Sequence, residues 1–200
     1  MTQETASTGK MRVRYSDQPK FRRGLSIFLA GPTPRSKPGQ AKTSNSWRPQ
    51  AIKILEELGF EGTVLVPERT DWSVKFEYDD QTEWEWAGLH AATVVVFWIP
   101  RKVRIMPAFT TNVEYGSWIT KDPTKCVFGG PEWAERKNRY LRWLYHKEAK
   151  RARLRRASYH TLKDTLAAAI ELAAKLEKMG PPSKPVRALR KPAAQSQKKD

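Results

Sequence analysis

The chain has 200 residues, 39% of them hydrophobic, and a formal net charge of +16. This length and apolar content suit one well-packed core, whereas no apolar run reaches the roughly 18 residues of a membrane-spanning helix, and the N-terminus lacks the apolar segment of a signal peptide. Cys126 is the single cysteine, which excludes an intrachain disulfide, so we expect a buried core thiol in a cytoplasmic protein.

The first part of the chain predicts two strands and a helix. Residues 1–24 are polar and without hydrophobic period, which predicts a disordered arm. Residues 25–32, "LSIFLAGP", are typical of a buried strand that ends in Gly-Pro. Residues 46–59 have apolar positions near helical spacing and begin with the candidate N-cap Ser46. Residues 62–68, "GTVLVPE", predict a second short strand.

The middle of the chain continues the alternation of helix and strand. Residues 79–92 predict a helix, and the run "TVVVFWI" at 93–99 predicts the most apolar strand of the chain. A short helix is expected from about residue 111 to 120, followed by a fourth strand at 125–130.

The last part of the chain predicts two helices and a tail. Residues 131–154 read as a long basic helix. Residues 159–180 predict a second helix, with a single apolar face and an N-terminal cap formed by Thr161 and Asp164. Residues 179–200 are rich in proline and lysine and predict a disordered basic tail.

Short apolar strands that alternate with helices predict an α/β fold. We expect a Rossmann- or flavodoxin-like arrangement, a mostly parallel sheet flanked by helices, with a C-terminal helical extension and one domain over residues 25–178. Ligands of such sheets bind at the carboxyl ends of the strands. Polar, charged and aromatic residues crowd these ends at 30–35, 67–72 and 99–114, where we expect the site.

Glu114 has two interpretations. Thr111 and Glu114 fit the S/T-x-x-E capping box, in which the two side chains only secure a helix start. Alternatively, Glu114 is one of the two carboxylates that glycosidic cleavage needs, kept ionised by the helix dipole in the first turn. The second carboxylate would be Glu85 or Glu83, and indole rings such as that of Trp98 would wall the pocket or pack in the core.

Three motifs together resemble a known family. "IFLAGP" at 27–32, "WEWAGLHAATVVVFWIP" at 84–100 and "TTNVEYGSW" at 110–118 are similar to the nucleoside 2-deoxyribosyltransferase-like superfamily. That superfamily includes the deoxyribosyltransferases and the nucleoside 5′-monophosphate N-glycosidases. The resemblance runs from about residue 25 to 130.

The resemblance implies roles for individual residues. Glu114 corresponds to the family's nucleophile, and Glu85 falls where the family places an acidic residue beside the sugar and base. Arg35 resembles the arginine that hydrolytic members place near a 5′-phosphate, and Ser46 and Arg48 are further candidates. The other expected substrate contacts lie in or beside the motifs: Gly31, Glu83, Thr110, Thr111 and Trp98.

The resemblance also implies an activity and an assembly. We expect an enzyme that cleaves the N-glycosidic bond of a (deoxy)nucleoside or its 5′-monophosphate, needs no cofactor, and forms homodimers or larger assemblies of dimers. Water or a second base accepts the sugar, and both remain open. Thr110 stands where the family has a glycine, and Ala108 stands where some transferases carry an aspartate.

The charge distribution offers a different class of function. Residues 146–200 contain 15 of the 37 basic residues and only 5 of the 21 acidic ones. A basic terminal segment of this kind contacts polyanions without sequence specificity, or only keeps the protein soluble. The alternative to the enzyme is therefore a nucleotide- or nucleic-acid-binding module on the same fold. None of the histidines has a partner spaced for a metal site, so no metal is expected.

Overall fold

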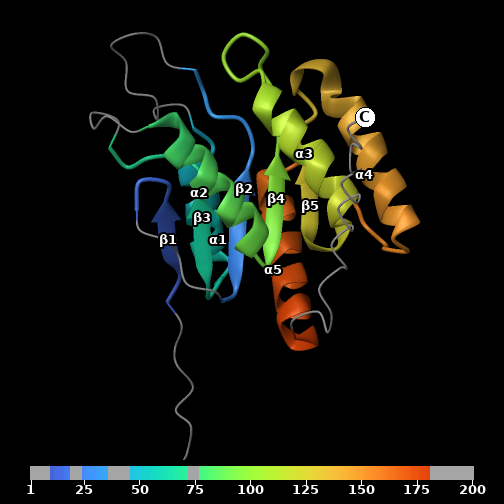
Figure 1. Cartoon of the computed structure of the whole chain (residues 1–200). Coiled ribbons are helices and arrows are strands. Elements are labelled where there is room, and N and C mark those ends of the chain that lie inside the picture. The colour runs from blue at the N-terminus through green and yellow to red at the C-terminus, as the bar shows by residue number, and fades with distance from the viewer. Residues whose placement is uncertain (1–9, 19–23, 36–45, 72–76, 181–200) are drawn as a thin grey trace, which may run out of the picture.

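A parallel sheet forms the centre of the molecule. The computed structural model describes residues 10–18, 24–35, 46–71 and 77–180, and within them five strands pair in the order β1-β3-β2-β4-β5, all parallel (Figure 1). The strands are β1 (Arg12–Tyr15), β2 (Ser26–Ala30), β3 (Thr63–Val66), β4 (Val94–Trp98) and β5 (Cys126–Gly129). The predicted α/β fold with a parallel sheet is confirmed.

Helices cover both faces of this sheet. They are α1 (Arg48–Glu57), α2 (Tyr78–Ala91), α3 (Phe109–Lys121), α4 (Arg139–Arg151) and α5 (Leu162–Met179). Helices α1 and α5 pack on one face, and α2, α3 and α4 pack on the other (Figure 1). The predicted long basic helix begins only at α4, because the preceding residues 135–138 form a short 3₁₀ helix, η2.

The core has two layers because the strands are apolar on both faces. All residues of β2 and β4 are buried, as expected for the inner strands of a covered parallel sheet. Alternate residues point to opposite faces. Ile27 and Leu29 therefore pack with α1 and α5, while Phe28 and Ala30 pack with α2, α3 and α4.

The N-terminal arm contains a strand that the sequence did not predict. Residues 1–24 were expected to be disordered, which is wrong for β1, since Arg12–Tyr15 pairs with β3 at the edge of the sheet. Val13 and Tyr15 pack against the core, whereas the alternating arginines are more exposed. This alternation spans only four residues among many polar ones, so it is too short to stand out in the sequence.

Helix α5 closes the chain as predicted. The Thr161 hydroxyl accepts a hydrogen bond of 3.1 Å from the Asp164 backbone N–H, which confirms the predicted cap. Gly180 follows α5 with a positive φ of 71°, and the predicted tail beyond it lies outside the described residues. In the described part of the chain, no helix is both long and apolar enough to cross a membrane.

Candidate active site

Helix α3 carries Glu114 at the carboxyl edge of the sheet. The helix follows β4 through residues 99–108 and starts at Phe109, with Ala108 as its N-cap in the left-handed conformation at φ 63°. No side chain caps this helix, and Thr111 lies buried inside it. The capping-box interpretation of Thr111 and Glu114 is therefore wrong, because the helix begins two residues earlier than predicted.

The ionisation of Glu114 is controlled by its surroundings and not by the helix start. Burial, and after it the negative charge of Glu85, raise the pKa of Glu114, the positive charge of Arg48 lowers it, and the net result is a pKa of about 7. The prediction that the helix dipole keeps Glu114 ionised is wrong, because Glu114 lies in the second turn of α3, beyond the reach of that effect.

Glu85 is held on α2 by a chain of hydrogen bonds. The Gln81 amide donates a bond of 2.8 Å to Glu85 Oε1, and Arg69 Nε donates one of 3.2 Å to Gln81 Oε1. Burial raises the pKa of Glu85, whereas the Gln81 bond and the Arg48 charge lower it. Glu83 is exposed, so the structure brings Glu85 to Glu114 and leaves Glu83 in solvent.

Arg48 is the buried cation of the site. Its side chain is 1% exposed and donates to Glu68 Oε1 at 2.7 Å, to the carbonyls of Leu29 and Gly31 at 3.1 and 2.6 Å, and to Thr33 Oγ1 at 3.1 Å. A buried charge is stable only when it is paired and hydrogen-bonded in this way. The contacts fix the guanidinium at the ends of β2 and β3, within electrostatic reach of both glutamates.

Gly31 permits a close approach between two neighbouring segments. A Cβ at this position would lie 2.2 Å from the Trp98 carbonyl oxygen and 2.8 Å from Trp47 Cζ2, so no side chain fits. The Trp98 indole, at 5% exposure, is buried in the core with α1 and α5. It therefore lies on the face of the sheet opposite to α2 and α3, and the structure does not bring it to the two glutamates.

The remaining predicted residues lie near the start of α3. The Arg35 guanidinium carbon lies 5.6 Å from the centre of the Phe109 ring, and the Arg35 backbone N–H donates to the Ile105 carbonyl at 2.7 Å. Arg35 is exposed, which leaves its guanidinium accessible to a ligand. Thr110 is also exposed, whereas the neighbouring Thr111 is buried.

Sequence reasoning missed the polar residues that support the two glutamates. Glu68 accepts a bond of 2.8 Å from the Ser46 hydroxyl as well as the Arg48 bond, and Gln81 orients Glu85. The one signal in the sequence was their position along the chain. Glu68 and Arg69 come just after the buried strand β3, at the sheet edge where ligands bind.

The arrangement favours proton-dependent chemistry between two carboxylates. Burial raises the pKa of both carboxyl groups, and the charge of Glu85 acts on Glu114, so the two groups titrate as a coupled pair. Among the residues that the structure describes, no group of three or more His, Cys, Asp and Glu side chains could hold a metal ion. Cys126 is buried, and burial raises the pKa of its thiol to about 12.

The region that contains the candidate site matches a known family. A family model described as nucleoside 2-deoxyribosyltransferase like matches residues 24–132, more than half of the chain. This segment contains strands β2 to β5 and both Glu85 and Glu114. No curated protein sequence matches the chain. The chain belongs to the nucleoside 2-deoxyribosyltransferase-like family.

Proposed function

We propose that the protein cleaves the N-glycosidic bond of a (deoxy)nucleoside or nucleoside 5′-monophosphate. Membership of the family supports an enzyme that acts on a nucleoside. The observation that carries the proposal is the pair formed by Glu114 and Glu85, two half-buried carboxyl groups with raised pKa values at the carboxyl edge of the sheet.

In the first step, the ionised Glu114 carboxylate attacks C1′ of the sugar. The bond between C1′ and the base nitrogen breaks, and a bond between C1′ and a Glu114 oxygen forms. The leaving base takes a proton from the solvent, and Glu85, whose negative charge acts on Glu114, helps to position the sugar. The buried Arg48 supplies positive charge that lowers the pKa of Glu114 and so favours its ionised form.

In the second step, the sugar leaves Glu114. A water molecule attacks C1′, Glu85 accepts its proton, and Glu114 is released as a carboxylate. If a second base attacks in place of water, the same steps transfer the sugar to that base. Arg35 is our candidate for contact with a 5′-phosphate, because a guanidinium pairs well with phosphate oxygens and this one is exposed beside α3.

The substitution Glu114→Gln tests the nucleophile. Glutamine nearly matches glutamate in shape but removes the attacking carboxylate, so we expect base release to slow at least about a thousandfold, a barrier increase of roughly 4 kcal/mol. Release of free base from a panel of nucleosides and 5′-monophosphates, followed by chromatography, measures the rate. A 2-deoxy-2-fluoro substrate analogue should leave a sugar adduct on the peptide that contains Glu114.

The matched control is Glu83→Gln, which makes the same chemical change on the exposed face of α2. It should retain the wild-type rate. Full base release by Glu114→Gln would remove Glu114 from the mechanism. Absence of base release by the wild-type chain over the whole panel would instead favour a binding module without catalysis.

Assembly is a separate part of the proposal. We propose a homodimer, as the family resemblance implies, with a nucleoside or nucleotide as the small-molecule ligand. Light scattering of the full chain during gel filtration tests it, and a mass of one chain at all concentrations would contradict it.

A further inference from the structure

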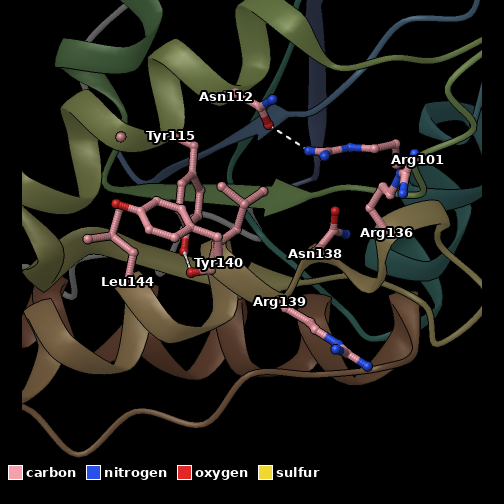
Figure 2. A pocket seen from close by; sticks show the side chains of 10 residues that line it. Arg101, Asn112, Tyr115, Arg136, Asn138, Arg139, Tyr140 and Leu144 are labelled. Atoms are coloured by element: carbon pink, nitrogen blue, oxygen red, sulfur yellow. Dashed lines mark hydrogen bonds between the residues drawn. The ribbon is translucent and has the colours of Figure 1, made fainter.

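A second cavity lies between α3 and the start of α4. Its volume is about 320 Å³, which reaches the lower end of the range for small-molecule sites. Figure 2 shows the side chains around it. The cavity is lined by residues of the loop after β4, of α3, of η2 and of α4: Arg101, Asn112, Tyr115, Gly116, Arg136, Asn138, Arg139, Tyr140, Leu141 and Leu144.

This cavity is distinct from the candidate active site. Asn112, Tyr115 and Gly116 contribute one edge of α3 to it. Glu114 is two positions after Asn112, a rotation of about 200° around a helix, and therefore projects from the other side. Neither Glu114 nor Glu85 lines the cavity.

One half of the cavity is polar and incompletely hydrogen-bonded. The Arg101 guanidinium donates a bond of 2.6 Å to Asn112 Oδ1, but its buried Nε has no partner within the described part of the chain. Asn138 is 3% exposed and donates from Nδ2 to the Ile99 carbonyl at 2.8 Å, whereas its Oδ1 has no partner there. Buried polar atoms are almost always satisfied, so these two atoms are available to bond a ligand.

This polar half is also positively charged. Arg101 and Arg136 lie close together beside Asn138 in Figure 2, and Arg139 extends along the rim. Burial lowers the pKa of Arg101, and no carboxylate lines the cavity to compensate its charge. The adjacent Glu135 accepts a bond of 2.8 Å from the Val103 N–H. The charge of this half favours an anion.

The other half is aromatic and apolar. The rings of Tyr115 and Tyr140 and the side chain of Leu144 gather there, away from the arginines (Figure 2). The Tyr115 hydroxyl donates to the Leu141 carbonyl at 2.5 Å, which fixes that ring in the wall. Tyr140 is 68% exposed and its ring centre lies 5.5 Å from that of Trp143, so the rest of the Tyr140 ring is accessible to a planar group.

We propose that this cavity is a second binding site, which takes a nucleotide. Its phosphate pairs with Arg101 and Arg136, and its base stacks on Tyr140. Asn138 Oδ1 accepts a hydrogen bond from a hydroxyl or amino group of the ligand. A free nucleotide and the phosphorylated end of a nucleic acid strand share this chemistry. The site does not depend on catalysis by Glu114.

The test compares Arg136→Asn with Arg153→Asn. Both arginines adopt a left-handed backbone, with φ of 62° and 58°, and asparagine tolerates that conformation. Arg153 follows the far end of α4 and does not line the cavity, so it controls for the loss of one positive charge. Each substitution is placed in the full chain with Glu114→Gln, which prevents consumption of the probe.

The probe is adenosine 5′-monophosphate, measured by calorimetry. We expect Arg136→Asn to weaken binding at one site at least tenfold, Arg153→Asn to change it less than threefold, and adenosine to bind that site far more weakly. The 8-azido derivative should label the peptide that contains Tyr140, and Tyr140→Ala should abolish this labelling. Equal affinities in the two arginine variants, or equal binding of adenosine, would overturn the proposal.

A single-stranded oligonucleotide with a 5′-phosphate distinguishes the two sources. If it competes for the Tyr140 label more tightly than the mononucleotide, the natural ligand is a strand end; if it competes less tightly, the ligand is a free nucleotide. If the wild-type chain releases no base but the Tyr140 peptide is labelled, only the enzymatic proposal is contradicted. If the wild-type chain releases base but the Tyr140 peptide is not labelled, only the second site is contradicted.

Discussion

Burial and one shared buried cation, Arg48, act in opposite directions on the charge of Glu114 and Glu85, and burial is the larger effect. Arg48 lowers the pKa of both glutamates, while burial raises both. Arg48 itself also pairs with Glu68 at 2.7 Å, so its positive charge is divided among three carboxyl groups. The protonation of the site near neutral pH therefore depends on the two glutamates together.

The rate of base release should depend on pH through this pair. Because the ionised form of Glu114 is the nucleophile, kcat/KM should rise as the pH passes through about 7. Glu85→Gln removes a negative charge that raises the pKa of Glu114, so the rising limb should move to lower pH even though the rate falls. Rate measurements from pH 5 to 9 determine the position of the limb.

Glu83→Gln serves as the control for this shift, since Glu83 is exposed on the same helix. The pH range over which kcat/KM rises in this variant should coincide with that of the wild type. If kcat/KM of Glu85→Gln rises at the same pH as that of the wild type, the charge of Glu85 does not act on the carboxylate that limits the rate.

The stability of the fold should depend on Glu114 in the same pH range. Its pKa is higher in the folded chain, about 7, than the ordinary value of 4.5. The folded state therefore binds more protons between these values, and this contribution to stability, present below pH 4.5, is lost as the pH rises through 7. The loss is on the order of 3–4 kcal/mol, because the pKa rises from 4.5 to about 7 at about 1.4 kcal/mol per pKa unit.

Glu114→Gln has no charge to bury, so it should melt like the wild type near pH 5 and several degrees higher near pH 8. Thermal unfolding of both chains across this range measures the difference. A variant that is less stable than the wild type at pH 8 would show that the Glu114 carboxylate is held by favourable contacts instead of being disfavoured by burial.

At the scale of elements, apolar patterning predicted most of the fold. The runs at β2, β3, β4 and β5 are buried on both faces, and such runs are readable without tertiary information. The start of α3 was not readable, because its N-cap is Ala108 in a left-handed conformation, which alanine rarely adopts. The sequence therefore favoured Thr111 as the N-cap of the helix. In the structure the helix begins at Phe109, and its N-cap Ala108 is packed in the core.

The two glutamates were readable from the sequence only through motifs, and their partners were not. Gln81 lies one turn before Glu85 on α2, but the partner that orients it, Arg69, comes from the end of β3. The pairing of Arg48 with Glu68 likewise joins residues 20 positions apart. Contacts of this kind depend on the order of the strands, which spacing along the chain does not encode.

The cap of α5 offers a direct test of one element. Thr161→Ala removes the hydroxyl that accepts from the Asp164 N–H, and we expect it to cost about 1 kcal/mol of unfolding free energy. Thr161→Ser keeps the hydroxyl and should cost much less. Urea denaturation followed by circular dichroism measures both. Equal losses in the two variants would assign the effect to the threonine methyl group.

At the scale of the whole molecule, the family match and the packed core do not end at the same place. The match stops at residue 132, but α5 supplies buried residues to the core beside β4 and α1. These are Leu162, Leu166, Ala169, Leu172 and Ala173. We therefore propose that the predicted domain over residues 25–178 and the added strand β1 form one domain, in which α5 is part of the fold and not an appendage.

Two truncations test this proposal. A chain that ends at Gly180 should unfold cooperatively and release base at the wild-type rate, because it keeps the whole of α5. A chain that ends at Ser158 should lose cooperative unfolding, because the apolar face under α5 becomes exposed. Thermal melts and base-release assays compare them. A cooperative melt of the shorter chain would make α5 dispensable.

The late position of α5 affects how the protein is made in the cell. Ile27, Leu29, Val94 and Val96 have left the ribosome long before the helix that covers them has been synthesised. At roughly 5–20 residues per second, the stretch from the end of β4 to the end of α5 takes on the order of 4–16 seconds to translate. During that interval α1 alone covers part of this apolar face, so we expect the growing chain to be prone to aggregation until α5 has been made.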